Sequence, residues 1–252
     1  MIERHWCELD GARLHYQTVG SGDPVVLIHG LSASSRWWHR NIDALAERFT
    51  LHIIDLIGFG RSRGRQRFNL AESAALLAHW METIGLERAH IVGHSMGGYI
   101  AAQLAAEFPE KVNRLVLVDA AVPLPRKTRL QHLSQLSREM RYTPPRFLHL
   151  LATDAMLAGP RTVLSAANQL IVADLEPELP KIAAPVLLIW GANDPLVPPA
   201  VADRLEELIP NARRHVIPGC GHKPMLERPA EFNEAVIAFL TEQAPEREDG
   251  EH

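Results

Sequence analysis

The chain has 252 residues, of which 46% are hydrophobic and 22% charged, and its formal net charge is −4. This composition is typical of a globular protein with one sizeable core, and it excludes a collagen, a disordered chain and a mini-protein. The near-neutral balance provides no broad cationic field, so we expect no nucleic-acid partner.

The first residues and the two cysteines bear on the cellular compartment. The chain shows neither the basic start and apolar run of a secretory signal nor a run of about eighteen uncharged apolar residues that could span a membrane. Cys7 and Cys220 match neither a disulfide framework nor a metal-ligand spacing, so we expect two buried or half-buried thiols. These features predict a cytoplasmic protein without membrane association.

Stretches with the pattern of β-strands recur along the chain. Residues 14–19 alternate loosely, as a half-buried edge strand does. Five later stretches are mostly apolar throughout, which is typical of strands in a sheet that is covered on both faces. These stretches are residues 25–28, 51–54, 89–92, 115–118 and 186–189, and a further strand is expected at residues 214–217.

Helix-period segments separate these strands. Asn69 can cap a helix with Glu72 as its partner in a capping box, and Pro198 and Pro199 suit the start of another helix that runs to about Ile209. Alternating strands and helices predict an α/β fold with a mostly parallel, doubly wound sheet.

The alternation breaks between residues 122 and 184, where prolines separate short helical patches and no convincing strand occurs. We therefore expect a helical insertion at residues 122–184 in a core formed by residues 1–121 and 185–243. The polar segment 244–252 is expected to be a frayed tail.

A nucleophile is predicted in the sequence GHSMG at residues 93–97, which follows the strand at 89–92 and precedes an alanine-rich helical run. A sharp strand-to-helix turn strains its apex residue, and the flanking glycines let the neighbouring backbone approach. Ser95 would then lie above the carboxyl edge of the sheet, where the helix N-terminus favours negative charge. The alternative is a glycine-rich turn with a capping serine.

A serine nucleophile requires a base, and the base requires an orienting acid. Asp194 follows the strand at 186–189, and His222 follows the last strand in a glycine-flanked loop. Loops at the carboxyl ends of parallel strands converge on a ligand crevice, so we expect both side chains near Ser95. Asp119, which follows the strand at 115–118, remains an alternative acid, whereas Asp55 is expected to be structural.

Together these motifs resemble the α/β-hydrolase superfamily over about residues 25–240. The motifs are HG at 29–30, GHSMG at 93–97, GAND at 191–194 and GH at 221–222, in the order of that family. The resemblance implies that Ser95 is the nucleophile, that His222 is the general base and then acid, and that Asp194 orients the imidazole. It also implies that the backbone N–H groups of Leu31 and Met96 form the oxyanion hole.

The serine in the strand-to-helix turn also distinguishes between the chemistries of the superfamily. Haloalkane dehalogenases and epoxide hydrolases attack with a carboxylate, and Ser95 cannot form their alkyl-ester intermediate. The leading hypothesis is a carboxylesterase that cleaves small to medium acyl esters through an acyl-serine, as a monomer and without a metal or organic cofactor.

Two alternatives to the esterase remain open. The first is a carbon–carbon bond hydrolase of vinylogous diketones, although residues 30–35 lack the extra glycine and proline that such enzymes usually carry there. The second is a small-molecule receptor derived from a hydrolase, with slight turnover.

The insertion at 122–184 is expected to form a lid over the triad and to select the substrate. Trp37, Phe147 and Leu148 are the candidate substrate-binding residues, and the alternative is that such apolar side chains only pack the lid on the core. Arginines cluster at residues 61–67 and in the early insertion, where they would attract anionic substrates if they face the entrance, or simply form a solvated surface.

Overall fold

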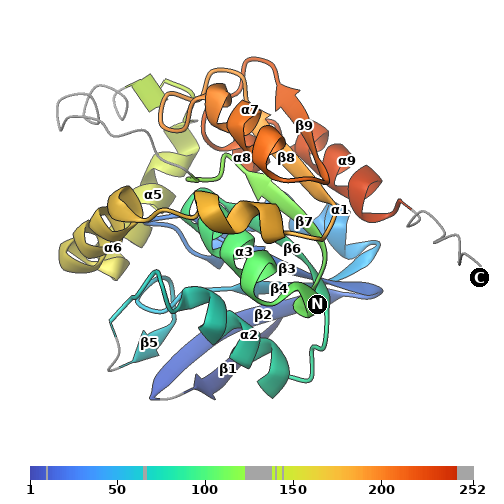
Figure 1. Cartoon of the computed structure of the whole chain (residues 1–252). Helices are drawn as coiled ribbons and strands as arrows, with labels where there is room; N and C mark the ends of the chain where they lie inside the picture. Colours follow the sequence, from blue (N-terminus) through green and yellow to red (C-terminus); the bar gives the residue numbers. More distant parts are fainter. Residues whose placement is uncertain (10, 65–66, 123–137, 140, 144, 243–252) are drawn as a thin grey trace, which may run out of the picture.

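The computed structural model describes residues 1–9, 11–64, 67–122, 138–139, 141–143 and 145–242. Within these residues, nine strands form a single sheet (Figure 1). The strands are β1 Glu3–Leu9, β2 Ala12–Gly20, β3 Asp23–Ile28, β4 Phe49–Ile54, β5 Arg63–Gly64, β6 Ala89–His94, β7 Val112–Val118, β8 Val186–Gly191 and β9 Ala212–Ile217.

The strand order is β1-β2-β4-β3-β6-β7-β8-β9, with β5 paired to β2. The pairs from β4 to β9 are parallel, whereas β2 pairs antiparallel with β1, β4 and β5. This arrangement confirms the α/β prediction. The prediction of an edge strand at 14–19 was wrong, because β1 covers that side of β2 and itself forms the edge.

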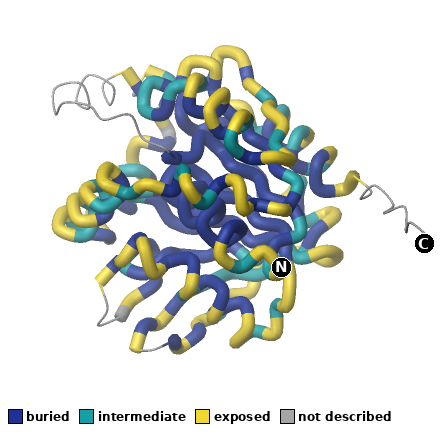
Figure 2. The backbone as a smooth tube through the Cα atoms, viewed as in Figure 1, coloured by how far each residue is buried: buried dark blue, intermediate teal, exposed yellow. Residues whose placement is uncertain are grey.

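Helices cover both faces of the sheet (Figure 1). Side chains of successive strand residues point to opposite faces of the sheet. In β3, Val26 and Ile28 therefore pack in one apolar cluster, and Val25 and Leu27 pack in the other. The first cluster includes α2 Ser73–Thr83, α3 Met96–Glu107 and α7 Pro199–Leu208, and the second includes α1 Ile42–Ala46, α8 Pro224–Glu227 and α9 Pro229–Leu240. Figure 2 shows the result, with buried strands between helices that are exposed on their outer sides.

The described part of the insertion is helical. It contains α5 Pro145–Ala158, α6 Pro160–Val172 and a 3-10 helix at Glu176–Lys181, and the remaining stretch 123–137 lies outside the described residues. α5 and α6 contact one another, as Figure 1 shows. α5 is tied to the loop after β3, because the carboxylate of Asp154 accepts a hydrogen bond from Ser34 Oγ at 2.9 Å.

Two predicted helix starts had different outcomes. α7 begins at Pro199 as expected. The Asn69 cap was wrong, because α2 begins at Ser73 and Asn69 Oδ1 accepts a hydrogen bond from the N–H of Ala71 instead. Asn69 forms a local turn before the helix, which is a competing use of the same side-chain oxygen.

Cys7 and Cys220 are free and buried, as the sequence predicts. Among the helices of the described residues, none combines the length and the apolar character needed to cross a membrane. The expected tail at 244–252 lies outside the described residues.

Candidate active site

Ser95 occupies a strained turn between β6 and α3. Its φ and ψ angles are 53° and −115°, a backbone conformation that non-glycine residues rarely adopt. The turn is held by β7 and the segment after it, because the N–H of Ser95 donates to Val118 O at 2.9 Å and its carbonyl accepts from Ala121 N at 3.1 Å. The surrounding structure therefore fixes the hydroxyl at the end of a buried strand.

Glycines around Ser95 are required by close backbone contacts. A Cβ at Gly97 would lie 2.5 Å from the carbonyl oxygens of Ile28 and His29, so α3 begins directly against the end of β3. A Cβ at Gly30 would lie 3.1 Å from Ser95 Cβ. The loop after β3 and the nucleophile turn are thus packed against each other.

The loops after β8 and β9 meet at the same edge of the sheet. A Cβ at Gly191 would lie only 1.9 Å from the carbonyl oxygen of Gly221, so only glycine permits this approach. The approach brings Asp194 and His222 together across two neighbouring parallel strands.

The three predicted catalytic side chains form one hydrogen-bonded chain. His222 Nδ1 lies 2.7 Å from Asp194 Oδ2, and His222 Nε2 lies 3.0 Å from Ser95 Oγ. All three residues are buried, and Ser95 retains 9% exposure. In this geometry Nδ1–H donates to the carboxylate, and Nε2 can accept the serine proton.

Asp194 is held as a carboxylate by several donors. Besides His222, the backbone N–H groups of Leu196 and Val197 donate to Oδ1 at 2.7 and 3.0 Å. Hydrogen bonds to an ionised carboxylate stabilise its charge. Asp194 is therefore the carboxyl group that is held in place against the imidazole.

Asp119, the alternative acid, lies beside this pair rather than elsewhere. Oxygen or nitrogen atoms of Asp119, Asp194 and His222 all lie within 4.8 Å of one another. Asp119 accepts one hydrogen bond, from Gly191 N at 3.0 Å, and its Oδ2 has no partner among the described residues. Complete burial, and then the negative charge of Asp194, raise the pKa of Asp119 well above its usual range, which favours its protonated form.

The His222 loop is clamped by residues that the sequence analysis did not assign. His222 O accepts a hydrogen bond from His94 Nε2 at 2.8 Å, and the two rings lie 4.9 Å apart, so His94 lies directly against His222. Burial lowers the pKa of His94 well below its usual value, so the ring is neutral.

A buried ion pair secures the other side of the same loop. Lys223 is paired with Glu139 from the insertion, and Glu139 also accepts the N–H of His222 at 3.2 Å. Burial lowers the pKa of Lys223 to about 8. The only sequence signal for this clamp is a lysine next to the predicted catalytic histidine, which does not identify a distant glutamate as its partner.

The cluster of Asp119, Asp194 and His222 has the residue types of a metal site, but its atoms are used otherwise. The 2.7 Å contact between His222 Nδ1 and Asp194 Oδ2 is a direct hydrogen bond that leaves no space for an ion between them. The arrangement suits proton transfer and orientation of the imidazole.

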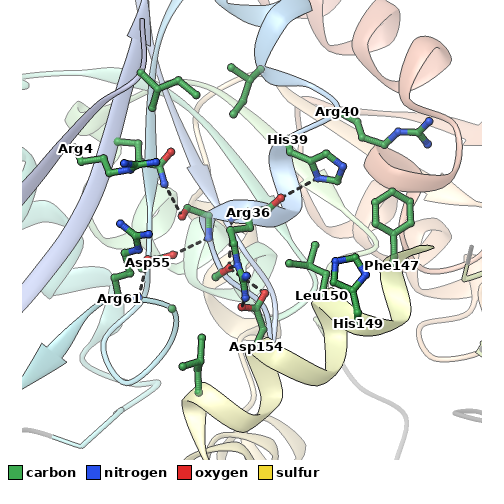
Figure 3. A pocket seen from close by; sticks show the side chains of 17 residues that line it. Arg4, Arg36, His39, Arg40, Asp55, Arg61, Phe147, His149, Leu150 and Asp154 are labelled. Carbon is green, nitrogen blue, oxygen red and sulfur yellow. Dashed lines mark hydrogen bonds and ion pairs between the residues drawn. The ribbon is translucent and has the colours of Figure 1, made fainter. Parts of the chain in front are cut away.

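The candidate substrate-binding residues are placed differently from one another. Trp37 is buried and its indole N–H donates to Asp154 at 3.0 Å, while Phe147 is buried and Leu148 is exposed. Trp37 and Phe147 line a cavity of only about 10 Å³, which is too small for a substrate. Phe147 also lines a cavity of about 840 Å³ whose described lining contains none of the triad residues (Figure 3).

The arginines singled out in the sequence lie in different surroundings. Arg61 lines the cavity of Figure 3, whereas Arg63 and Arg67 line a second cavity beside α6. Arg65 and the cluster at 126–129 lie outside the described residues. Asp55 is structural, as predicted, because it accepts hydrogen bonds from Ser35 N and Arg61 N and contacts His15 Nδ1.

A parallel sheet with a serine elbow, a histidine and an aspartate at its carboxyl edge defines a serine hydrolase-like protein of the α/β class. The family model described as "Alpha/beta hydrolase family" matches residues 25–235, and the chain belongs to this family. Its relatives place it among the hydrolases.

The similar proteins include enzymes of more than one kind. The chain is 32% identical to the pimeloyl-[acyl-carrier protein] methyl ester esterase of Nitrosomonas europaea, over 88% of this chain and 97% of that protein. It is 33% identical to the 2-hydroxy-6-oxononadienedioate/2-hydroxy-6-oxononatrienedioate hydrolase of Burkholderia vietnamiensis, over 90% and 91%. Among solved structures, a bacterial membrane phospholipase A is similar with a TM-score of 0.83 and 30% identity, covering 95% of this chain and 86% of that chain.

Proposed function

We propose that the protein is a serine carboxylesterase that cleaves small to medium acyl esters through an acyl-serine intermediate. The observation that carries this proposal is the position of His222, with Asp194 at 2.7 Å on one ring nitrogen and Ser95 at 3.0 Å on the other. This is the geometry that activates a serine hydroxyl.

In the first step, Ser95 Oγ attacks the ester carbonyl while His222 Nε2 takes the hydroxyl proton. Asp194 stabilises the imidazolium that forms, and the histidine then gives its proton to the departing alcohol. In the second step, water attacks the acyl-serine with His222 as base, which releases the carboxylic acid and restores the serine. The proton transfers of both steps need only the three side chains and a water molecule.

The tetrahedral intermediate carries a negative oxygen that requires donors. We assign this role to the backbone N–H groups of Met96, the first residue of α3, and Leu31, in the loop after β3. The close packing of Gly30 on Ser95 and of Gly97 on the end of β3 supports this assignment, because it brings both loops to the nucleophile.

Asp119 has a supporting role in this mechanism. Because it holds a proton beside the charged Asp194, it can donate a hydrogen bond to that carboxylate and fix its orientation. It acts through Asp194 and is a positioning residue.

The insertion is proposed to be the lid over the acyl site. Glu139 bonds the His222 backbone, and a Cβ at Gly221 would lie 2.8 Å from Tyr142 Cβ, so described parts of the insertion touch the loop of the catalytic histidine. A lid in this place would select the acyl chain and exclude water during attack.

Carbon–carbon bond hydrolysis is the second candidate, because the chain is also similar to an enzyme named for an oxononadienedioate. The loop at residues 30–35 lacks the extra glycine and proline expected for that activity, which favours the ester.

A substrate panel separates the candidates. Chromogenic esters of increasing acyl length, matching thioesters and a vinylogous diketone should be compared in wild-type protein and in the Ser95→Ala variant. We expect sustained turnover of esters and a loss of kcat of about 10⁶-fold in the variant. Faster turnover of the diketone would favour carbon–carbon hydrolysis, and a burst that stops at one equivalent would favour a receptor.

A further inference from the structure

The cavity of Figure 3 lies between the core and α5, and its volume is about 840 Å³. Its walls come from β1, the 3-10 helix Ser35–Trp38, the loop after β4, and α5 (Figure 3). Cavities of 300 to 1,000 Å³ hold small molecules. Since its described lining excludes the triad, it is a site that the proposed hydrolysis does not use.

Cationic side chains outnumber carboxylates around this cavity. Asp55 and Asp154 are its acidic residues, and both are at most 1% exposed. Asp55 is engaged by Ser35 N and Arg61 N, and Asp154 by Ser34 Oγ, Trp37 Nε1 and Arg36. The basic residues of the described lining are Arg4, Arg36, His39, Arg40, Arg61 and His149.

Two of these arginines are available to a ligand. Arg4 and Arg61 are exposed, and within the described part of the chain neither guanidinium has an ion-pair partner. Arg4 belongs to β1 and Arg61 follows β4, so both come from the core side of the cavity (Figure 3). By contrast, Arg36 is already paired with Asp154. The positive charge of Arg4 and Arg61 is therefore not compensated by neighbouring carboxylates.

The wall from α5 is largely apolar. Phe147, Leu150 and Leu157 line the cavity from this helix, and Leu157 is 54% exposed. An apolar body that packs on this wall would remove that surface from water.

We propose that the cavity binds an amphipathic organic anion, with its oxyanion headgroup at Arg4 and Arg61 and its apolar chain against α5. A guanidinium recognises carboxylate and phosphate oxygens alike through paired, charge-assisted hydrogen bonds. The headgroup can therefore be the carboxylate of a fatty acid or the phosphate of an alkyl phosphate. The proposal concerns binding alone and stands independently of the proposed esterase activity.

Calorimetric titration of the full chain tests this assignment with four probes: octanoate, octyl phosphate, inorganic phosphate and octanol. We expect saturable binding of at least one of the two amphipathic anions, and the tighter of them identifies the headgroup. Binding of inorganic phosphate and of octanol should be at least about tenfold weaker, because each lacks one half of the recognised structure. Equal binding of octanol, or no saturable binding of either anion, would overturn the proposal.

Variants locate the site. Arg4→Gln/Arg61→Gln should weaken binding of the tighter anion at least about tenfold, and Leu157→Glu, which places a carboxylate in an exposed part of the wall, should do the same. Arg13→Gln/Arg48→Gln removes the same charge elsewhere on the surface and should leave the affinity within about twofold. Unchanged affinity in both cavity variants would overturn the proposal. Circular dichroism and a thermal melt confirm that each variant is folded.

Discussion

The proposed catalytic edge of the sheet, which holds Ser95, Asp194 and His222, differs from the cavity between the core and α5 in how charged side chains are used. At the catalytic edge, Asp194, His222 and Asp119 are buried and each engages its neighbours directly. In the cavity the carboxylates are buried and engaged, but Arg4 and Arg61 are exposed to solvent. Burial with direct hydrogen bonds therefore fixes geometry for chemistry, whereas exposed charge without a carboxylate partner is available to bind or attract another molecule.

The largest effect is expected from the two acids of the catalytic edge. Asp194→Asn should lower kcat by about 10⁴-fold, since the amide no longer holds the imidazole in its working tautomer. Asp119→Asn should change kcat by less than about threefold, because the amide can still accept from Gly191 and donate to Asp194 as the protonated acid does. Steady-state kinetics on one chromogenic ester measure both. If Asp119→Asn caused the larger loss, Asp119 rather than Asp194 would be the catalytic acid.

In the cavity, the structural role of the buried carboxylate of Asp154 can be tested by removing it. Asp154→Ala removes the acceptor of Ser34 Oγ and Trp37 Nε1 and should lower the free energy of unfolding by about 2 to 4 kcal/mol, because these buried donors lose their partner. Urea denaturation measures the change. Glu234→Ala, at an exposed position of α9, is the matched control and should stay within about 0.5 kcal/mol of wild type. A similar loss in both variants would mean that Asp154 does not anchor α5.

The proton on Asp119 predicts a pH dependence of stability. Its pKa is raised in the folded state, so above the ordinary carboxyl range the folded chain holds one proton more than the unfolded chain. This contribution is fully present at low pH and is lost as pH rises toward the raised value. The free energy of unfolding of wild type, relative to Asp119→Asn, should therefore fall from about pH 4 upward. A constant difference between pH 4 and pH 8 would show that Asp119 is ionised.

The smallest effect is expected from the exposed arginines. If they attract anionic substrates, added salt should lower kcat/KM for an anionic ester more than for a neutral ester of the same acyl length. Arg4→Gln/Arg61→Gln should reduce that difference. An equal salt response of the two esters would limit the role of these arginines to binding inside the cavity.

The sheet was predictable wherever strands are buried on both faces, because β3, β6, β7 and β8 each contain a mostly apolar stretch of four residues. β1 was missed, since its sequence ERHWCEL has only two buried residues and reads as a polar segment. The triad was predictable because each member carries a local glycine motif at the end of a strand. The clamp of Glu139 on Lys223 was not, because it depends on how the insertion folds back on the core.

The proximity of Asp119 and Asp194 could not be predicted from the sequence either. Both residues follow apolar strands, so each is a credible acid from sequence alone. Only the adjacency of β7 and β8 in the sheet places the two carboxyls together. Their different hydrogen-bond partners then decide which of them is charged.

The proposed role of Ser95 as the nucleophile can be tested by mass spectrometry of the chain quenched during turnover of a slow ester. We expect one acyl group per chain, which peptide mapping should locate on Ser95. We expect no acyl group in the Ser95→Ala variant. The Asp119→Asn variant, treated in the same way, should still be acylated. Sustained hydrolysis with an unmodified Ser95, or an acyl group on another residue, would contradict this role.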